Sequence, residues 1–173
     1  MKKLYTLLLL IFTLALTSAA FGADGVKLGS VDIQKVLIQS DAGKEAKEQL
    51  AVKGNKYEAE KNSREDELKA LKGDLEKQSV LLSETARSAK EKDYQQKLKE
   101  YQRFLKDAQE DLQSKNDDFT NRIVEEIVKI IRNYGKTNGY TYIFARNDIM
   151  VFMDEKVDLT DEILKAFNAS RKK

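Results

Sequence analysis

The residues of this chain that could carry out acid–base chemistry are almost entirely carboxylates. Its 173 residues include 29 Asp and Glu but no His and no Cys. Without His and Cys, the usual zinc and copper sites, the Ser-His-Asp triad and thiol catalysis each lack a required member. The acidic residues are spread among lysines, and nothing in the pattern marks a pair held in a pocket. We therefore expect solvated helix surface and predict no enzymatic activity, no metal site and no cofactor.

A second unusual feature is the stretch Gly139 to Asp154, GYTYIFARNDIMVFMD, which follows a long charged region. Its first part alternates as a strand does, and Ile149 to Met153 is apolar on both faces, with Arg146 to Asp148 supplying a turn. A hairpin that is apolar on both faces is an aggregation hazard when exposed, so it requires partners. The segment VKLGSVDI near the N-terminus has strand composition and is expected to add a third strand.

Three short strands and about two helices make a small core, so identical neighbours in a closed ring are the simplest way to cover the sheet edges. We predict a homo-oligomer with the strands at the subunit junctions. The alternative is a monomer with a local hydrophobic cluster. The residues expected at the junctions are Val31, Ile33, Tyr140, Tyr142, Ile143, Phe144, Ile149, Val151 and Phe152.

The middle of the chain predicts two long helices. Apolar or small residues recur at spacings that are sums of threes and fours, close to a coiled-coil repeat. Lys61, Arg64 and Gln78 interrupt the first stripe, and Gly54 and Gly73 weaken its helix. The first stripe is Ala46, Leu50, Tyr57, Leu68, Leu71, Leu75 and Leu82; the second is Tyr94, Leu98, Tyr101, Leu105, Ala108, Leu112 and Phe119.

The ends of these helices carry recognisable signals. Ser83 is a plausible N-cap after a reversal near Leu82, so the two stripes should pack as an antiparallel pair roughly 60 Å long. After Phe119 the second helix becomes apolar on more than one side, which indicates deeper burial, and Gly139 is the favoured stop. The final helix, Thr160 to Asn168, opens with Thr160 as the expected cap. The fold class is therefore α+β and mainly α, with a helical hairpin arm on a small three-stranded body.

The N-terminus has the features of a secretory signal peptide. Two lysines precede an apolar stretch from Leu7 to Leu16 and then small residues, with cleavage expected after Ala20 or Gly22. Removing Lys2 and Lys3 leaves 29 basic residues against 29 acidic ones, so charge gives no case for a nucleic-acid partner. The expected organisation is a signal peptide at 1–22, body at 24–42, arm at 43–118 and body again at 119–173.

Several segments together resemble the Skp (OmpH-like) family of periplasmic chaperones. They are the start VKLGSVDIQKVLIQSDAGKEAKEQL, the heptad-like hairpin, the Gly139-Tyr140 entry into YIFARNDIMVFMD, and the ending DLTDEILKAFN. The resemblance implies a periplasmic homotrimer whose sheet body holds three helical arms around a cavity. It also implies an ATP-independent holdase that takes in unfolded outer-membrane proteins, prevents their aggregation and hands them on for insertion. Lipopolysaccharide or an anionic lipid surface is a further partner that the resemblance implies.

A holdase needs many weak apolar contacts set among charges rather than one deep pocket. The residues expected to contact clients are Val80, Leu81, Leu82, Leu71 and Leu75, although closing the hairpin tip is an equally good role for the tip residues. The tip from Lys69 to Lys92 carries six basic and four acidic residues.

Two other functions remain open. A structural coiled-coil envelope tether would bind no client, and a longer, better-packed seam than the interrupted one of this chain would favour it. A nucleic-acid or lipid-surface binder would require a basic face, and only Arg171 to Lys173 form a contiguous basic run, which a solvated tail also explains.

Overall fold

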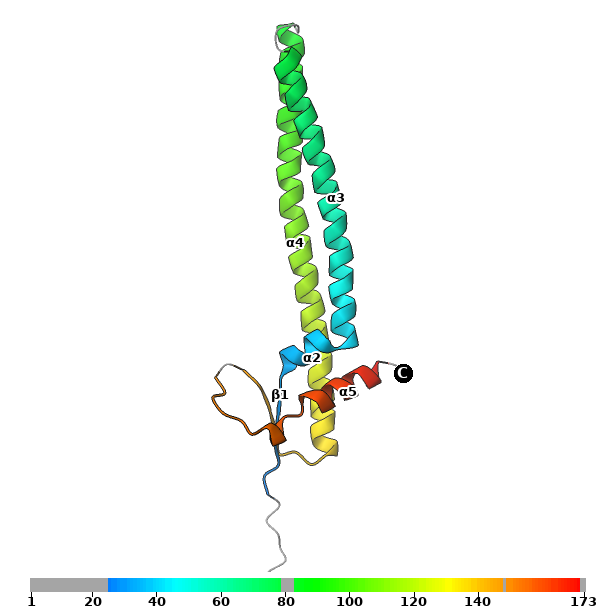
Figure 1. Ribbon diagram of the computed structural model, residues 1–173, viewed down its shortest axis with the longest axis vertical. Helices are drawn as coiled ribbons and strands as arrows, with labels where there is room; N and C mark the ends of the chain where they lie inside the picture. The colour runs from blue at the N-terminus through cyan, green and yellow to red at the C-terminus, as the bar shows by residue number, and fades with distance from the viewer. Residues whose placement is uncertain (1–24, 79–82, 148, 172–173) are drawn as a thin grey trace, which may run out of the picture.

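The computed structural model describes residues 25–78, 83–147 and 149–171. The predicted signal peptide, residues 1–22, lies outside these residues. Figure 1 shows two long helices running side by side, with the remaining elements gathered at one end. The order of elements is β1 (Leu28–Val31), α2 (Ile33–Gln39), α3 (Asp41–Gln78), α4 (Glu84–Thr137), β2 (Tyr142–Ala145), the 3₁₀ turn η2 (Glu155–Val157) and α5 (Thr160–Ser170).

The predicted helical hairpin is confirmed: α3 has 38 residues and pairs with α4, which has 54. We call α3 and the part of α4 that packs against it the arm. The apolar stripes lie along the contact between the two helices. Their half-buried members are Leu50, Tyr57, Leu68, Leu71 and Leu75 on α3, and Tyr94, Leu98, Tyr101, Ala108 and Leu112 on α4.

Both ends of α4 are closed by the residues that the sequence indicates. The Ser83 hydroxyl accepts a hydrogen bond from the Ala86 amide at 3.3 Å. At the other end Gly139 adopts a φ of 68°, and the Tyr140 amide donates to the Gly135 carbonyl at 2.9 Å. This is the Schellman pattern, in which a residue without a Cβ takes the left-handed conformation after the helix. The chain thereby turns back from the long helix into β2.

The sheet differs from the prediction. β1 and β2 pair in parallel, with Leu28 opposite Tyr142 and Val31 opposite Ala145, and these are the two strands of the described residues. The expected third strand at 149–153 is absent from the described part of that segment, where Asn147 closes a turn by accepting a hydrogen bond from the Met150 amide at 3.1 Å. The predicted three-stranded body with a strand hairpin is therefore wrong for the single chain.

A different segment from the predicted one lies along the second edge of β1. Asp158 forms a parallel bridge with Ser30, and the Leu159 amide donates to the Ser30 carbonyl at 2.8 Å. The other edge of β2 carries no strand in the described residues, so residues 149–153 do not form the predicted hairpin with β2. The amides of Ile149 and Met150 donate to Asn147, and the remaining backbone groups of the segment must be satisfied by water or by another chain.

The body, which we define as all elements other than the arm together with the C-terminal part of α4, is held by one small core. α4 crosses the body and packs against α2 and α5, as the arrangement in Figure 1 shows. Ile127, Ile163 and Phe167 are buried almost completely. The other buried apolar residues are Val31, Val36, Ala42, Ala46, Ile123 and Leu159. This core explains why α4 becomes apolar on several sides after Phe119.

The start of α5 also departs from the prediction. Thr160 is the first helical residue, and the N-cap position falls on Leu159, which makes no side-chain cap hydrogen bond. The Thr160 amide donates to Oδ1 of Asp158 at 3.0 Å, and the Thr160 hydroxyl does not cap the helix. That hydroxyl instead accepts from the Asp32 amide at 2.9 Å, and Arg146 pairs with Asp158 at 2.7 Å. Asp158 thus joins the ends of both strands to α5.

The base of the arm is fixed to the body at two points. The Asp41 amide donates to Oδ1 of Asn168 at 3.0 Å, and Arg171 pairs with Glu126 at 2.6 Å. Between α2 and α3, Ser40 accepts from the Gly43 amide at 3.0 Å and donates to the Leu37 carbonyl at 3.0 Å. α5 and this bend therefore set the direction in which the arm leaves the body.

Candidate functional site

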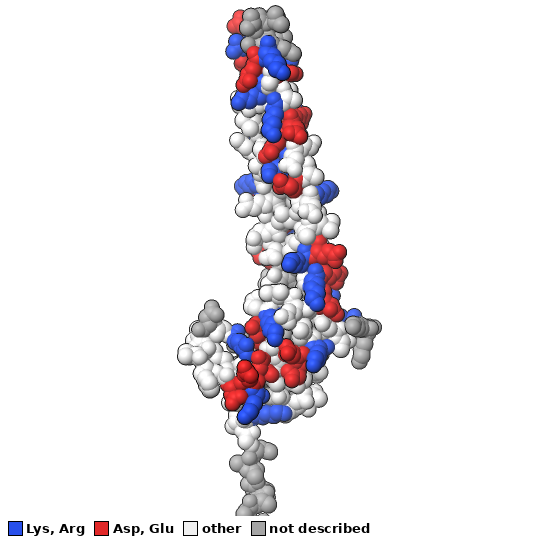
Figure 2. All heavy atoms as spheres, viewed as in Figure 1, with Lys and Arg blue, Asp and Glu red and all other residues white. Residues whose placement is uncertain are grey.

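Several carboxylates of the arm form ion pairs with lysines, two of them across the two helices. Asp111 of α4 pairs with Lys53 of α3, and Glu67 of α3 pairs with Lys97 of α4 at 2.8 Å. In the described residues, no group of three or more acidic residues is placed to hold a metal ion. No helix of the described residues is long and apolar enough to cross a membrane. Figure 2 shows acidic and basic side chains interspersed along the molecule on the face in view.

Tyrosine hydroxyls provide further polar ties between the two arm helices. Tyr57 donates to Oδ2 of Asp111 at 2.9 Å, and Tyr101 donates to Oε1 of Glu65 at 2.5 Å. The hydrogen bonds from Lys53 and then Tyr57 hold the pKa of Asp111 below its ordinary value. The same carboxylate raises the pKa of Tyr57 through the hydrogen bond between them. These ties fix the register of α3 against α4.

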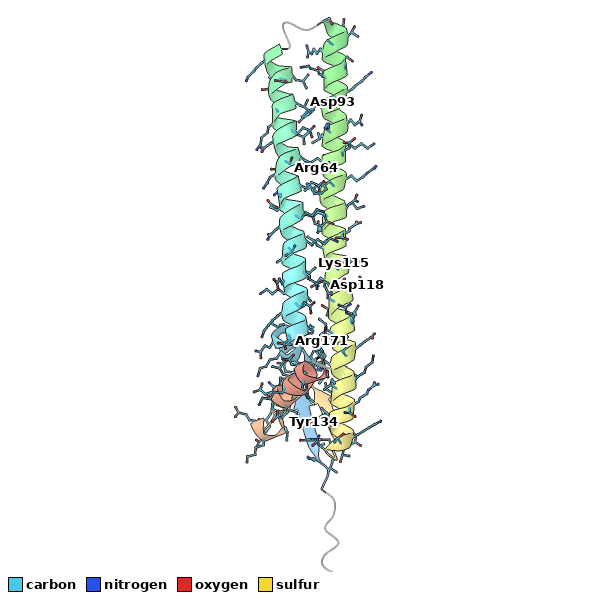
Figure 3. All side chains as sticks on the ribbon, turned by 90° about the vertical axis from the view of Figure 1, so that its right-hand side faces the viewer. Arg64, Asp93, Lys115, Asp118, Tyr134 and Arg171 are labelled. Carbon is cyan, nitrogen blue, oxygen red and sulfur yellow. The ribbon has the colours of Figure 1, made fainter. Side chains whose placement is uncertain are left out.

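The middle of the arm contains an aromatic contact that the sequence pattern did not indicate. Phe104 lies edge-on to Tyr57, with ring centroids 6.0 Å apart, and the Arg64 guanidinium lies 4.7 Å from the Phe104 ring centroid. Arg64, labelled in Figure 3, thus contributes to the contact between the helices, although it interrupts the apolar stripe. Leu105, the stripe residue assigned from spacing, is 37% exposed. A stripe shifted by one residue, to Phe104, would have predicted this half-buried ring at the helix contact.

Because small residues alternate with large ones, the helices leave an open groove on one side of the arm. Two hollows of about 620 Å³ and about 220 Å³ adjoin one another and share Leu50 and Asn116 in their walls. We call their union the arm groove. Its floor consists of Leu50, Ala108, Leu112 and Phe119, and one wall is the row Gln109, Gln113, Asn116 and Thr120 of α4.

The structure describes two of the five residues expected to contact clients. Leu71 and Leu75 are half-buried on α3, in the contact with α4, so little of each side chain faces outward. Val80, Leu81 and Leu82 lie outside the described residues. The arm groove was not identified from the sequence. The sequence feature that could have indicated this groove is its wall, a row of uncharged polar residues on an otherwise charged helix.

The residues expected at subunit junctions fall into two groups. Val31 lies in the core of the chain itself, and Ile33, Tyr140 and Ile143 pack partly against that core. The second group is exposed: Tyr142, Phe144, Ile149, Val151 and Phe152. Exposure reaches 98% for Val151 and 86% for Phe152, so the second group is available for contact with another chain.

The sheet explains this division. Residues opposite each other in register share a face, so Val31 and Ile143 turn inward while Leu28, Tyr142 and Phe144 remain exposed on the outer face. The rings of Tyr142 and Phe144 stack with centroids 6.0 Å apart. Leu28 is 44% exposed and belongs with this outer face, although the sequence analysis did not single it out.

These features define a class of protein in which a long two-helix arm projects from a small body with an exposed apolar sheet face. Residues 27–167 match the model of the family described as outer membrane protein (OmpH-like), so the chain belongs to this family. The resemblance drawn from the sequence is thereby confirmed.

Two individual proteins are similar to this chain over most of its length. An uncharacterized protein of Aquifex aeolicus (strain VF5) is 30% identical over 165 residues, which are 95% of each chain. A crystal structure from Caulobacter crescentus CB15, described as a candidate OmpH-like outer membrane chaperone, superposes with a TM-score of 0.78 over 86% of this chain and 88% of that one. The sequence identity of that pair is 16%, so this likeness concerns the fold.

Proposed function

We propose that this protein is an ATP-independent holdase chaperone of the periplasm that keeps unfolded outer-membrane proteins from aggregating before they enter the membrane. Membership of the OmpH-like family supports a chaperone role. The observation that carries the proposal is the arm groove, an apolar surface along an otherwise charged arm with no covering element in the described residues. Such a surface gives an unfolded chain many weak contacts.

Release without ATP requires that each contact be weak. The arm groove is shallow and open along its length, and its apolar floor is interrupted by small residues such as Gly54. A bound segment therefore gains a limited hydrophobic free energy at each position and exchanges readily with solvent or with an insertion site. Charged residues that flank the groove keep the loaded protein in solution.

We also propose that three copies assemble through the outer face of the sheet and residues 149–153. β2 pairs with β1 on one side, and no second strand pairs with it in the described residues. The exposed side chains of Tyr142, Phe144, Val151 and Phe152 would be covered by neighbouring subunits. In this arrangement three arms would surround one cavity, and 149–153 would gain the strand partner that its own subunit lacks.

Light scattering and native mass spectrometry would test the proposal. A urea-unfolded outer-membrane barrel protein is diluted into buffer with and without this protein. Suppression of scattering, together with a complex of three subunits and one client, is the expected result. Client aggregation at the rate seen in buffer alone would contradict the holdase function.

The structural tether is a second candidate, favoured by the polar ties Tyr57–Asp111 and Tyr101–Glu65, which stiffen the arm. A tether would leave client aggregation unchanged but would keep the arms rigid. The scattering experiment therefore separates the two functions.

A further inference from the structure

We infer that the arm groove binds one extended, uncharged segment of an unfolded chain in which apolar and polar side chains alternate. This inference rests on the proposed holdase function and specifies the class of segment that the arm holds. It also moves the expected contact from the tip of the arm to its middle and base.

The floor of the groove selects apolar side chains. Leu50 and Leu112 are half-buried, so part of each side chain remains open to a ligand, and Ala108 and Gly54 leave room beside them. Toward the body, Ile38 is 67% exposed at the edge of the same groove. A row of apolar side chains on one face of an extended segment would cover these surfaces.

The wall of the groove selects an uncharged backbone that is free to form hydrogen bonds. Gln109, Gln113, Asn116 and Thr120 follow one another at intervals of four, three and four residues, which places them in one row on α4. In the part of the chain that the structure describes, the Gln113 amide nitrogen donates to Asp117 at 2.9 Å, whereas Gln109 and Asn116 make no side-chain hydrogen bond. Amides both donate and accept, as peptide groups do.

Charge complementarity argues for the same ligand. Lys61 and Glu58 at the rim pair with each other at 2.9 Å, so neither charge requires a counterion from the ligand. A charged segment entering the larger hollow would lose water without gaining a partner, which is unfavourable, and Lys47 in the smaller hollow is the one lining charge without an ion pair among the described residues. A helical segment satisfies its own backbone groups and would leave the amide row unused.

The length of the groove fits a short strand. Its α3 side runs from Gly43 to Lys61, which corresponds to about 27 Å of helix. An extended chain of about eight residues covers this distance. Alternating segments of about ten residues are the strands of membrane β-barrels, so the groove is suited to the strands of such precursors before they pair.

Peptide binding to the full mature chain tests the inference. The probe is a fluorescent peptide of about ten residues in which Leu and Tyr alternate with Ser and Thr, carrying one benzophenone photocrosslinker. A second peptide of the same composition has its apolar residues at helical spacing. We expect the alternating peptide to bind at least about tenfold more tightly, with crosslinks that map by mass spectrometry to the groove.

Two isosteric double variants provide the control. Gln109→Glu with Asn116→Asp places two negative charges in the wall, and we expect the Kd to rise by about tenfold. Gln95→Glu with Gln102→Glu adds the same charge to exposed positions of the same helix outside the groove, and we expect the Kd to stay unchanged. Circular dichroism should show equal helix content for both, because all four side chains are exposed.

Three results would overturn the inference. Crosslinks that map outside the groove, or an equal rise in Kd for both double variants, would place the peptide elsewhere. A groove variant that changes the sedimentation of the protein without peptide would identify the groove as a contact between copies. If the parent protein suppresses aggregation of the barrel precursor while any of these results holds, the inference alone fails. If it does not suppress aggregation, the proposed function fails as well.

Discussion

The hydroxyl of Tyr57 on α3 donates a hydrogen bond to the carboxylate of Asp111 on α4, 54 residues away, at 2.9 Å. Lys53, one turn below Tyr57, pairs with the same carboxylate oxygen. The two contacts cross the arm at the level of the arm groove, whose lining includes Tyr57. These two contacts therefore hold α3 and α4 in register beside the groove.

Protonation of Asp111 should loosen the arm. The pKa of this carboxyl lies below its ordinary value of 3.8 in the folded protein, chiefly because of the hydrogen bond from Lys53 and then that from Tyr57. Its contribution to stability is therefore present above the unfolded pKa and is lost as the pH falls through the folded pKa. We expect the melting temperature, followed by circular dichroism, to fall between pH 5 and pH 2.

Asp111→Asn provides the comparison for this pH dependence. The variant should melt a few degrees below the parent at pH 7 and show a shallower fall in acid, because the titrating group is gone. Asp118→Asn is a suitable control, since Asp118 is exposed on the same helix and makes no ion pair among the described residues. Parallel acid profiles for Asp111→Asn and the parent would contradict the assignment.

Alanine at the two arm glycines should stabilise the protein. A Cβ at Gly54 or at Gly73 would meet no atom within 4 Å, and both residues lie inside α3. Each replacement should raise the free energy of unfolding by about 0.5–1 kcal/mol, since Gly costs conformational entropy in a helix. Urea unfolding measures this gain, and a loss of stability at either position would contradict it.

Gly43→Ala is the matched opposite case. A Cβ there would lie 1.8 Å from the Leu37 carbonyl oxygen, in the bend between α2 and α3. We expect a loss of stability and a changed direction of the arm. Small-angle X-ray scattering of Gly43→Ala and Gly54→Ala would distinguish the two effects, because only the first should alter the molecular envelope.

The helices were predictable because their signals are local. Stripes of apolar residues, the cap at Ser83 and the stop at Gly139 each depend on a few neighbouring residues, and the structure has all of them. The cap of α5 was misassigned because Thr160 is drawn into a hydrogen bond with Asp32, 128 residues away. A contact of this kind depends on the whole fold, so residue spacing does not reveal it.

The sheet and the groove were less predictable for the same reason. Strand composition at 149–153 does not show whether that segment pairs with β2, and the segment found beside β1 at Ser30 is the one that contains Asp158. The groove arises from how two helices face each other, which depends on a rotation of one residue between Leu105 and Phe104. Periodicity predicts that an apolar stripe exists more reliably than it predicts which side chains lie at the centre of that stripe.

Truncation of the body core should destabilise the protein strongly. Phe167 is 1% exposed and packs in the core with Ile127 and Ile163. Phe167→Ala should lower the free energy of unfolding by about 3–5 kcal/mol, a large part of the stability of a typical domain. Val52→Ala, at a position 65% exposed on the arm, should change it by less than about 0.5 kcal/mol. Urea titrations that show similar losses would contradict the location of the core.

Charges in the exposed apolar segment should prevent assembly. Val151 and Phe152 are 98% and 86% exposed in the single chain and make no contact with its core. If they lie between subunits, Val151→Lys with Phe152→Lys would bury unpaired charges, so sedimentation velocity at micromolar concentration should show monomers. The helices should remain folded, because neither residue belongs to one.

Val52→Lys is the control for this experiment, since Val52 is an exposed apolar residue of the arm that lies far from the sheet. It should leave the sedimentation coefficient of the parent unchanged. A parent protein that sediments as a monomer, or a double lysine variant that stays oligomeric, would show that residues 149–153 do not mediate assembly. In either case the exposed side chains of this segment would need another partner, and an unfolded client chain would be the next to test by crosslinking from position 152.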